Sequence, residues 1–289
     1  SEISIFALGR LGIKQLTAGS DLDLMIIYDG IPDGFSNGQR ALPAASYVLR
    51  LAQTMVSWIS TPTAEGTLYD VDLRLRPEGQ ASAIAISIDR LATYFDQDAW
   101  IWEKQALTKA RPVAGDTGLT KRIQQLIDSI INHNHPKDRL VQAVFDMRQR
   151  IQKQQKPASQ WHLRQVSGGL TDIDLLIQAW RLQYGALFSG SGQPARVILQ
   201  TLYDNGVINK SCYEDMTGAS KCFNEIHHSL RLTLGSVVPT TDKLPQGLHH
   251  FILQRLGFPN NARFQHHFDL SINTVIQRIN AYLIMADKP

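Results

Sequence analysis

Two aspartates that stand just before an unbroken apolar run constrain this chain more than any other feature. Residues 21–28 are expected to form a strand with an apolar part at 24–28, and Gly19 and Ser20 form a tight polar entry to it. Because side chains alternate between the faces of a strand, Asp21 and Asp23 point to the same side. Two carboxylates about 4 Å apart repel by roughly 4 kcal/mol at an effective dielectric near 20. A Mg²⁺ ion removes that repulsion, because it prefers hard oxygen ligands.

The same residues also suit a simple turn, since Asp and Ser are common in turns and helix caps. An EF-hand is excluded, because its loop requires an oxygen ligand at position five and Gly at position six. This chain has Met25 and Ile26 at those positions. The motif alone leaves a metal site and a turn as alternatives.

A second segment, residues 69–77, alternates strictly between apolar and polar side chains. Its polar face carries Asp72, Arg74 and Arg76, and Pro77 is expected to end the strand. One acid and two arginines on one face suit an anionic ligand held together with a metal ion. The alternative is a solvated face with salt bridges, because antiparallel sheets commonly expose polar residues on one side.

The other segments of the first 117 residues mix short strands with helices. We expect, in chain order, a strand over 3–8, a turn over 9–12, one helical turn over 14–18, a helix opened by Pro43 and a helix over 87–97 capped by Ser87. The apolar face of the helix after Pro43 includes Tyr47, Val48 and Leu51.

Strand patterns disappear beyond the loop at residues 115–118. Helices with apolar periods near 3.6 are expected at about 119–131, 137–155, 171–184, 194–204, 210–235, 245–256 and 263–286. We therefore predict two domains, 1–117 and 118–289. The helix starting near 171 has Thr171 or Ser167 as its expected cap. Residues 190–192 mimic a dinucleotide-binding loop, but no strand precedes them.

Composition narrows the class of protein. The chain has 289 residues, 43% hydrophobic and 19% charged, which is ordinary for a globular protein. Its net charge of +3 does not indicate nucleic-acid binding, and no apolar run reaches the length of a membrane span. Two cysteines without a CxxC motif predict a reduced, cytoplasmic protein. A start without Met, already in a strand pattern, predicts a fragment of a longer protein.

The motifs taken together resemble the polymerase-beta-like nucleotidyltransferases and, within them, the glutamine synthetase adenylyltransferase family. The segments that carry the resemblance are Ala7-Leu8-Gly9-Arg10-Leu11-Gly12, Gly19-Ser20-Asp21-Leu22-Asp23, Asp72-Leu73-Arg74-Leu75-Arg76-Pro77, Trp102-Glu103-x-Gln105-Ala106-Leu107-x-Lys109-Ala110-Arg111 and Gly168-Gly169-Leu170-Thr171-Asp172-Ile173-Asp174. The sequence around Trp102 is similar to that of the half of the enzyme that adds AMP in this family.

The resemblance implies an α+β fold with two domains. Residues 1–117 would form a polymerase-beta-like nucleotidyltransferase domain, a small mixed sheet with flanking helices. Residues 118–289 would form an all-α helical bundle that docks the protein substrate or receives a regulatory signal. The implied reaction transfers AMP from ATP to a tyrosine of glutamine synthetase and releases pyrophosphate, which regulates nitrogen assimilation.

The resemblance also assigns roles to residues. Asp21, Asp23 and Asp72 would be the catalytic residues and would hold two Mg²⁺ ions, with Asp72 accepting the tyrosine proton. The nucleotide-binding residues would be Gly19, Ser20, Arg74, Arg76, Lys109 and Arg111. Glu103 is a further candidate for the site. Ile13 stands where the family usually has a second Gly. Ser20 would therefore contribute more of the contacts that bind the triphosphate.

Partners and alternatives follow from the same family. The expected partners are glutamine synthetase and, for the full-length enzyme, a PII-type signalling protein and glutamine as effectors, with neither nucleic acid nor membrane. The alternatives are the deadenylylating half of the same enzyme, a related uridylyltransferase, and a non-catalytic module that senses nucleotide or glutamine. The presence of all three carboxylates argues against the non-catalytic module.

Overall fold

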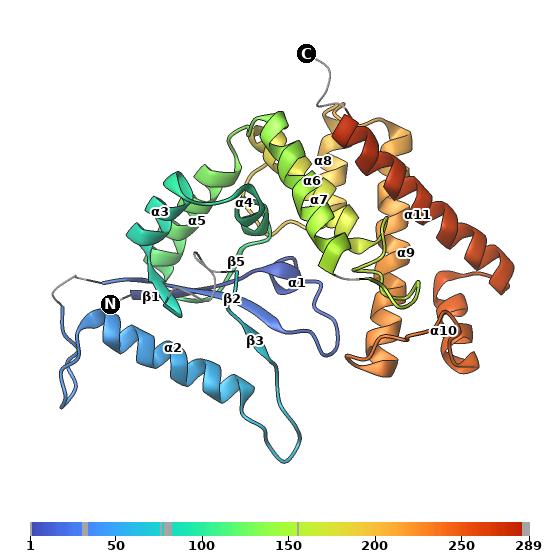
Figure 1. Ribbon diagram of the computed structural model, residues 1–289. Coiled ribbons are helices and arrows are strands. Elements are labelled where there is room, and N and C mark those ends of the chain that lie inside the picture. Colours follow the sequence, from blue (N-terminus) through green and yellow to red (C-terminus); the bar gives the residue numbers. More distant parts are fainter. Residues whose placement is uncertain (1, 31–33, 76, 78–82, 155, 285–289) are drawn as a thin grey trace. The chain divides into compact units, whose positions relative to one another are not determined.

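The computed structural model describes residues 2–30, 34–75, 77, 83–154 and 156–284 (Figure 1). It divides into two compact units. The sheet unit comprises Ser1–Leu16, Ser20–His133 and Ser189–Pro194, and the helical unit comprises Thr17–Gly19, Asn134–Phe188 and Ala195–Pro289. The main division therefore follows His133 and not residue 117. The reason is helix α5 (Thr117–Ile131), which packs on strands of the sheet unit through buried leucine and isoleucine side chains.

The sheet unit is built on a small mixed sheet. Its strands are β1 (Glu2–Ala7), β2 (Leu22–Asp29), β3 (Val71–Asp72), β4 (Ala85–Ser87) and β5 (Arg111–Gly115). The order is β3-β2-β1-β5, with β4 also paired to β2. Strand β1 is antiparallel to β2 and β5, whereas β3 and β4 run parallel to β2. The strands expected at 3–8 and 21–28 are confirmed within about a residue, whereas β4 and β5 were not expected from the sequence pattern.

Helices lie on both faces of this sheet (Figure 1). Helix α2 (Ala44–Ser60) lies on one face, and α3 (Ile88–Gln97) and α5 lie on the other. Two short helices, α1 (Gly9–Gly12) and α4 (Ile101–Leu107), complete the unit. The expected cap of α3 is confirmed, because the Ser87 side chain accepts the N–H of Arg90.

The segment after β1 differs from the expectation. Residues 9–12 form a short helix, α1, in place of the expected turn. No helical turn follows at 14–18, because Lys14 has a positive φ of 58° and the chain leaves the helical region there.

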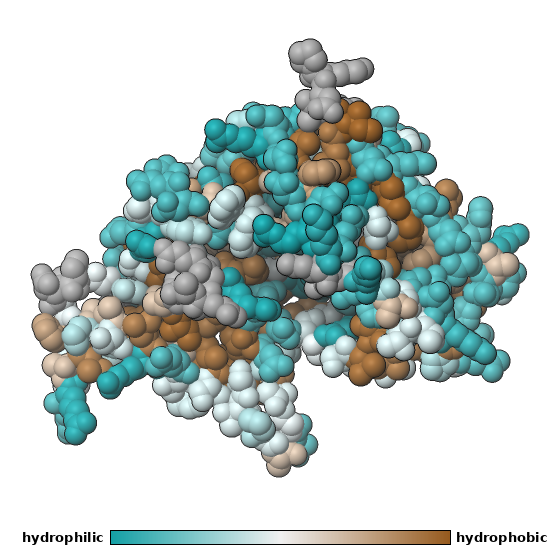
Figure 2. All heavy atoms as spheres, viewed as in Figure 1, coloured by the Kyte–Doolittle hydropathy of each residue, from teal (hydrophilic) through white to brown (hydrophobic). Residues whose placement is uncertain are grey.

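Helix α2 covers its face of the sheet incompletely. Val48 is fully buried, but Tyr47 and Leu51 remain 43% and 45% exposed, so the expected apolar face is only partly buried. A cavity of about 250 Å³ separates the helix from the sheet, and it is lined by Ile3, Ile5, Ile26, Val48, Leu51, Ala52, Thr54, Met55 and Trp58. Figure 2 shows hydrophobic side chains gathered along α2.

Glu103 has a structural role inside the sheet unit. Its side chain is buried at 6% exposure. The Tyr94 hydroxyl donates to one carboxylate oxygen at 2.7 Å, and the Trp100 N–H donates to the other at 2.8 Å. Both carboxylate oxygens of Glu103 thus bind groups near the start of α4. This structural role explains why an acid is buried here without assigning it to a catalytic site.

The helical unit is built of helices in its described residues, which is compatible with the expected helical bundle. Its helices are α6 (Lys137–Gln154), α7 (Leu170–Gln183), the 3₁₀ helix η2 (Gly185–Leu187), α8 (Ala195–Asp204), α9 (Lys210–Leu234), α10 (Gln246–Leu256) and α11 (Asn261–Ile284). One continuous apolar core runs between them and includes Leu176, Phe223 and Val275. Within the described ranges, no helix is both long and apolar enough to cross a membrane.

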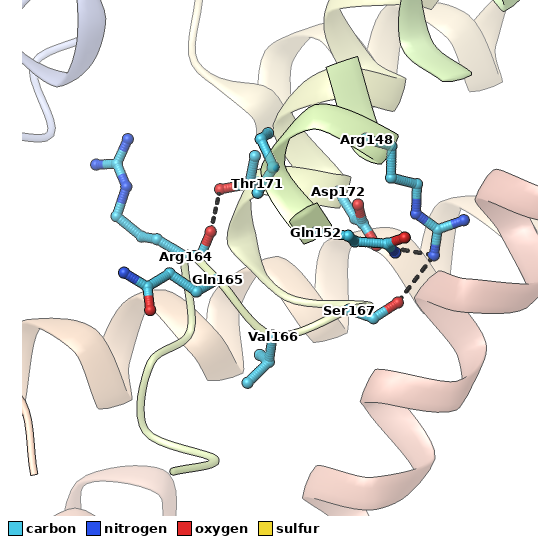
Figure 3. Close-up of a pocket in the computed structure, with 9 residues that line it drawn as sticks. Arg148, Gln152, Arg164, Gln165, Val166, Ser167, Thr171 and Asp172 are labelled. Atoms are coloured by element: carbon cyan, nitrogen blue, oxygen red, sulfur yellow. Dashed lines mark hydrogen bonds and ion pairs between the residues drawn. The ribbon is translucent and has the colours of Figure 1, made fainter. Parts of the chain in front are cut away.

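The start of α7 is not capped as expected. Its N-cap is Gly169, which has no side chain to accept the free N–H groups. Thr171 instead donates its hydroxyl to the carbonyl of Arg164 at 2.6 Å, and Ser167 accepts from Arg148 at 3.0 Å (Figure 3). The expectation of a Thr171 or Ser167 cap was therefore wrong.

Asp172 takes over part of the capping role. Its Oδ2 accepts the N–H of Gly168 at 2.7 Å and forms an ion pair with Arg148 at 3.1 Å. Arg148 comes from α6 and also donates to Asn280 of α11. The side chains of Arg148 and Asp172 are 13% and 8% exposed, so this buried pair links α6, α7 and α11.

We predict that Glu103→Ala lowers the free energy of unfolding by about 2 kcal/mol, because hydrogen bonds to a charged group are typically worth about 1.5–3 kcal/mol. Glu103→Gln keeps one acceptor and should lose less. Urea unfolding followed by circular dichroism measures both values. Equal stability of the alanine variant and the parent would contradict this role.

We predict that Asp172→Ala costs about 3–5 kcal/mol in unfolding free energy, because it leaves Arg148 as a buried charge without its partner. The matched control is Glu214→Ala, which removes an exposed i,i+4 pair with Lys210 in the same unit. That control should change stability by less than about 0.5 kcal/mol. Similar losses in the two variants, measured by urea unfolding, would show that burial does not set the energy of the Arg148 pair.

Candidate active site

The pairing of β2 with β3 brings two of the candidate aspartates together. These strands are parallel, and the register pairs Leu22 with Val71 and Asp23 with Asp72. In-register residues of neighbouring strands lie on the same face, with the strands about 4.8 Å apart. Asp21 stands two residues before Asp23, at the entry to β2, and is exposed. The expectation that Asp72 shares a side with Asp23 is therefore met by the backbone register.

Apolar neighbours fix this register. Leu24 and Leu73 follow the two aspartates and are buried in one cluster with Val48 of α2. The N–H of Leu22 donates to the carbonyl of Asp70 at 2.8 Å, which extends the pairing before β3 begins. Since neighbouring residues of a strand face opposite ways, burial of the leucines turns the aspartates to the other face.

Gly9 accommodates the Asp23 side chain. It begins α1 with a φ of +51°, and a Cβ atom placed on it would lie 2.0 Å from Asp23 Oδ2. The N–H of Leu8 donates to the Asp23 carbonyl at 2.8 Å, so the two segments are held closely together. Gly9 is thus a site residue whose role sequence reasoning missed. Its place in a Gly-containing turn was visible, but the carboxylate that fills its open side was not.

Asp72 ends its strand by binding Arg74. The Arg74 backbone N–H donates to Asp72 Oδ1 at 2.8 Å, and its guanidinium contacts both carboxylate oxygens at 2.5–3.0 Å. An Asp side chain that binds the N–H two residues on produces a turn. Within the described residues, the predicted strand over 69–77 is therefore confirmed only at Val71–Asp72. Arg74 lies beside Asp72 through this turn and not through strand alternation, and Arg76 lies outside the described residues.

All three carboxylates act on the same guanidinium. The pKa of Arg74 is raised, first by its hydrogen bond to Asp72 and by the charge of that carboxylate, and then by the charges of Asp21 and Asp23. Among the residues that the structure describes, no three His, Cys, Asp or Glu side chains form a ready metal site. The charge of the acidic group is balanced here in part by Arg74.

Three further candidates are Gly19, Ser20 and Lys109. Gly19 has a φ of +64°, which favours glycine and explains the tight turn before Asp21. Ser20 is half-buried and is the first residue of the sheet unit after that turn. Lys109, also half-buried, lies between α4 and β5.

Arg111 secures the end of α1. Its Nε donates to the carbonyl of Gly12 at 2.8 Å, and its Nη2 donates to that of Leu11 at 2.9 Å. These contacts give Arg111 a structural task and do not support its predicted contact with a nucleotide.

Residues 189–194 return from the helical half of the sequence to the same region. The Gly192 N–H donates to the Thr108 carbonyl at 2.9 Å, and the Ser191 hydroxyl donates to the Ala110 carbonyl at 2.7 Å. The glycine-rich loop at 190–192 therefore holds the segment before β5.

Comparison with known proteins gives consistent matches along the chain. The family model described as Glutamate-ammonia ligase adenylyltransferase matches residues 1–126, and the one described as GlnD PII-uridylyltransferase matches residues 142–284. The curated relatives are named bifunctional glutamine synthetase adenylyltransferase/adenylyl-removing enzyme. Adenylyltransferases are nucleotidyltransferase enzymes.

Three of these relatives show the extent of the similarity. The protein of Bartonella quintana (strain Toulouse) is 33% identical over 264 residues, which are 91% of this chain and 27% of the relative. That of Brucella suis biovar 1 (strain 1330) is 31% identical over 267 residues, 92% of this chain and 27% of the relative. That of Bradyrhizobium sp. (strain ORS 278) is 38% identical over 188 residues, 64% of this chain and 19% of the relative.

The chain thus spans about a quarter of the length of the Bartonella and Brucella relatives, and the matches cover both of its units. The segments that carry the sequence resemblance at residues 7–111 all lie within the first match. Residues 1–126 are therefore similar to the family of glutamate-ammonia ligase adenylyltransferases.

Proposed function

We propose that this chain transfers AMP from ATP to a tyrosine hydroxyl of glutamine synthetase and releases pyrophosphate. The observation that carries the proposal is the register of β2 and β3, which pairs Asp23 with Asp72. Asp21 precedes Asp23 by two residues on the same chain segment. The names of the relatives supply the acceptor protein and the nucleotide. A small mixed sheet with carboxylates on adjoining strands also supports a polymerase-beta-like fold for the sheet unit.

The three candidate aspartates suit Mg²⁺ by ligand type, and the proposal requires them to draw together when the ion binds, since the described residues form no ready metal site. Asp21, Asp23 and Asp72 offer carboxylate oxygens, the ligands that Mg²⁺ prefers. The open side of Gly9 leaves room for the Asp23 carboxylate. Arg74 occupies Asp72, but its side chain is 66% exposed and has room to turn toward solvent. When two Mg²⁺ ions are bound, they would activate the attacking hydroxyl and neutralise the leaving pyrophosphate.

The chain's own residues supply the remaining chemistry. The tyrosine oxygen forms a bond to the α-phosphorus while the bond from that phosphorus to the pyrophosphate oxygen breaks. Asp72 accepts the tyrosine proton, which requires hydrogen-bond reach in the ternary complex. Arg74, released from Asp72, binds the triphosphate, because guanidinium groups suit phosphate oxygens. Ser20 and Lys109 are further donors to the triphosphate.

The helical unit would dock glutamine synthetase or receive the regulatory signal. A PII-type protein and glutamine would act on the full-length enzyme. The match of residues 142–284 to a PII-uridylyltransferase model supports a role for this unit in nitrogen signalling. The same match, and the second activity in the relatives' name, favour two alternatives: uridylyl transfer and removal of AMP from glutamine synthetase.

The proposal predicts that incubation with ATP, Mg²⁺ and unmodified glutamine synthetase adds one AMP group to a tyrosine, detected by mass spectrometry. Asp21→Asn combined with Asp23→Asn should abolish transfer and leave the fold intact, because it removes two metal ligands. Asp29→Asn is the matched control at the other end of β2, where Asp29 pairs with Arg122. Transfer from UTP but not ATP, or release of AMP from modified glutamine synthetase, would identify an alternative.

We predict that Arg74→Ala lowers kcat/KM for ATP about 10- to 100-fold, roughly 1.4–2.8 kcal/mol of transition-state stabilisation. Arg122→Ala is the matched control, since Arg122 also pairs with an aspartate of β2 and is 50% exposed. Its kinetics should stay within about twofold of the parent. An unchanged KM and kcat in the Arg74 variant would remove that residue from the nucleotide site.

A further inference from the structure

The residues that join α2 to β3 form an exposed loop with a defined turn. All of residues 61–70 are exposed, and Figure 1 shows the loop extending away from the sheet. The Thr63 N–H donates to the Gly66 carbonyl at 2.9 Å, and the Gly66 N–H donates back to the Thr63 carbonyl at 3.0 Å. The Thr63 hydroxyl also donates to the Gly66 carbonyl, at 2.7 Å. The turn is therefore shaped by hydrogen bonds within the loop and not by burial in the core.

This loop holds large apolar side chains in solvent. The exposed fractions of the neighbouring residues Leu68 and Tyr69 are 69% and 41%. Trp58, in the last turn of α2 before the loop, is 76% exposed. Aromatic residues are favoured where proteins bind each other, because they supply large contact areas at a low cost in conformational entropy. Binding residues are also found disproportionately on loops that a rigid scaffold positions. The loop thus has the composition of a protein-binding surface.

The charge of the loop is of one sign. Glu65 and Asp70 are acidic, and residues 61–70 include no Lys or Arg. Complementary charge between two surfaces selects the partner and speeds association. The surface that matches this loop is therefore an apolar patch with a basic rim.

The loop ends at the candidate site. The Leu22 N–H donates to the Asp70 carbonyl at 2.8 Å, so the end of the loop already pairs with the start of β2. Asp72 follows, and the three steps from Tyr69 to Asp72 span at most about 11 Å. In the proposed reaction, the acceptor tyrosine must come within hydrogen-bond reach of Asp72. A folded acceptor that brings its tyrosine there also covers the neighbouring loop, so the occupant of this surface is the protein substrate.

We propose that residues 61–70 form a docking loop for the acceptor protein, with Leu68 and Tyr69 as its apolar anchors. This inference rests on the proposed function and adds to it the surface that recognises glutamine synthetase. The matching patch on the acceptor is apolar, is bordered by Lys or Arg, and lies next to the tyrosine that is modified. The docking loop acts by binding the acceptor and takes no part in binding the nucleotide.

The test combines Leu68→Ser with Tyr69→Ser in the full chain. Binding to immobilised, unmodified glutamine synthetase is measured by surface plasmon resonance without nucleotide or metal, so this readout does not depend on catalysis. Truncation of anchor residues in an interface commonly weakens binding about 10-fold or more. We expect a loss of affinity of that size and a similar rise in the KM for glutamine synthetase. The KM for ATP should stay unchanged, and kcat at saturating acceptor should be largely retained.

Phe35→Ser is the matched control. Phe35 is 69% exposed, as Leu68 is, but it follows the other end of β2 in the chain. Its affinity for glutamine synthetase should match the parent, and thermal unfolding checks that all variants fold. Unchanged affinity and unchanged KM for glutamine synthetase in the folded double variant would overturn the docking loop. A parent chain that binds glutamine synthetase through the loop but transfers no AMP would overturn the proposed function alone. A parent that neither binds nor modifies glutamine synthetase would overturn both.

Discussion

The two-residue pairing of β3 with β2 is the contact on which the geometry of the acidic group depends. So short a ladder supplies few hydrogen bonds, and a slip of one residue would turn Asp72 to the opposite face. The same slip would expose Leu73, which is buried against Leu24 and Val48. The register is therefore maintained by the apolar core beneath the strands. In this chain, leucine packing on one face of the sheet determines where the carboxylates stand on the other.

Arg74 and Gly9 show how the sheet unit keeps acidic side chains close to one another. Arg74 binds Asp72 and also interacts electrostatically with Asp21 and Asp23, so it lowers the repulsion among the three carboxylates. Gly9 makes steric room for Asp23 because it lacks a side chain. One residue acts through charge and the other through empty space. Both stand within two positions of a strand end, where the backbone departs from regular pairing.

The spacing of apolar residues along the chain predicted the regular helices and the two long strands. Strands β1 and β2 and the helices of the second half followed from apolar spacing, and the Ser87 cap followed from residue type. The end of β3 did not, because the Asp72 side chain binds the Arg74 N–H and outweighs the alternating pattern. The unit boundary after His133 depends on the packing of α5 on the sheet, which no local pattern reports.

The path of the chain has a consequence for any attempt to separate the two units. Residues 17–19 belong to the helical unit and residues 189–194 to the sheet unit, so the chain crosses the division several times. A cut after His133 would remove Ser191 and Gly192, and the carbonyls of Thr108 and Ala110 would lose their donors just before β5. The sheet unit is therefore not contiguous in the sequence, and a single cut after His133 would not release all of it. A chimaera that exchanges one unit between relatives would therefore also have to exchange residues 17–19 with the helical unit and residues 189–194 with the sheet unit.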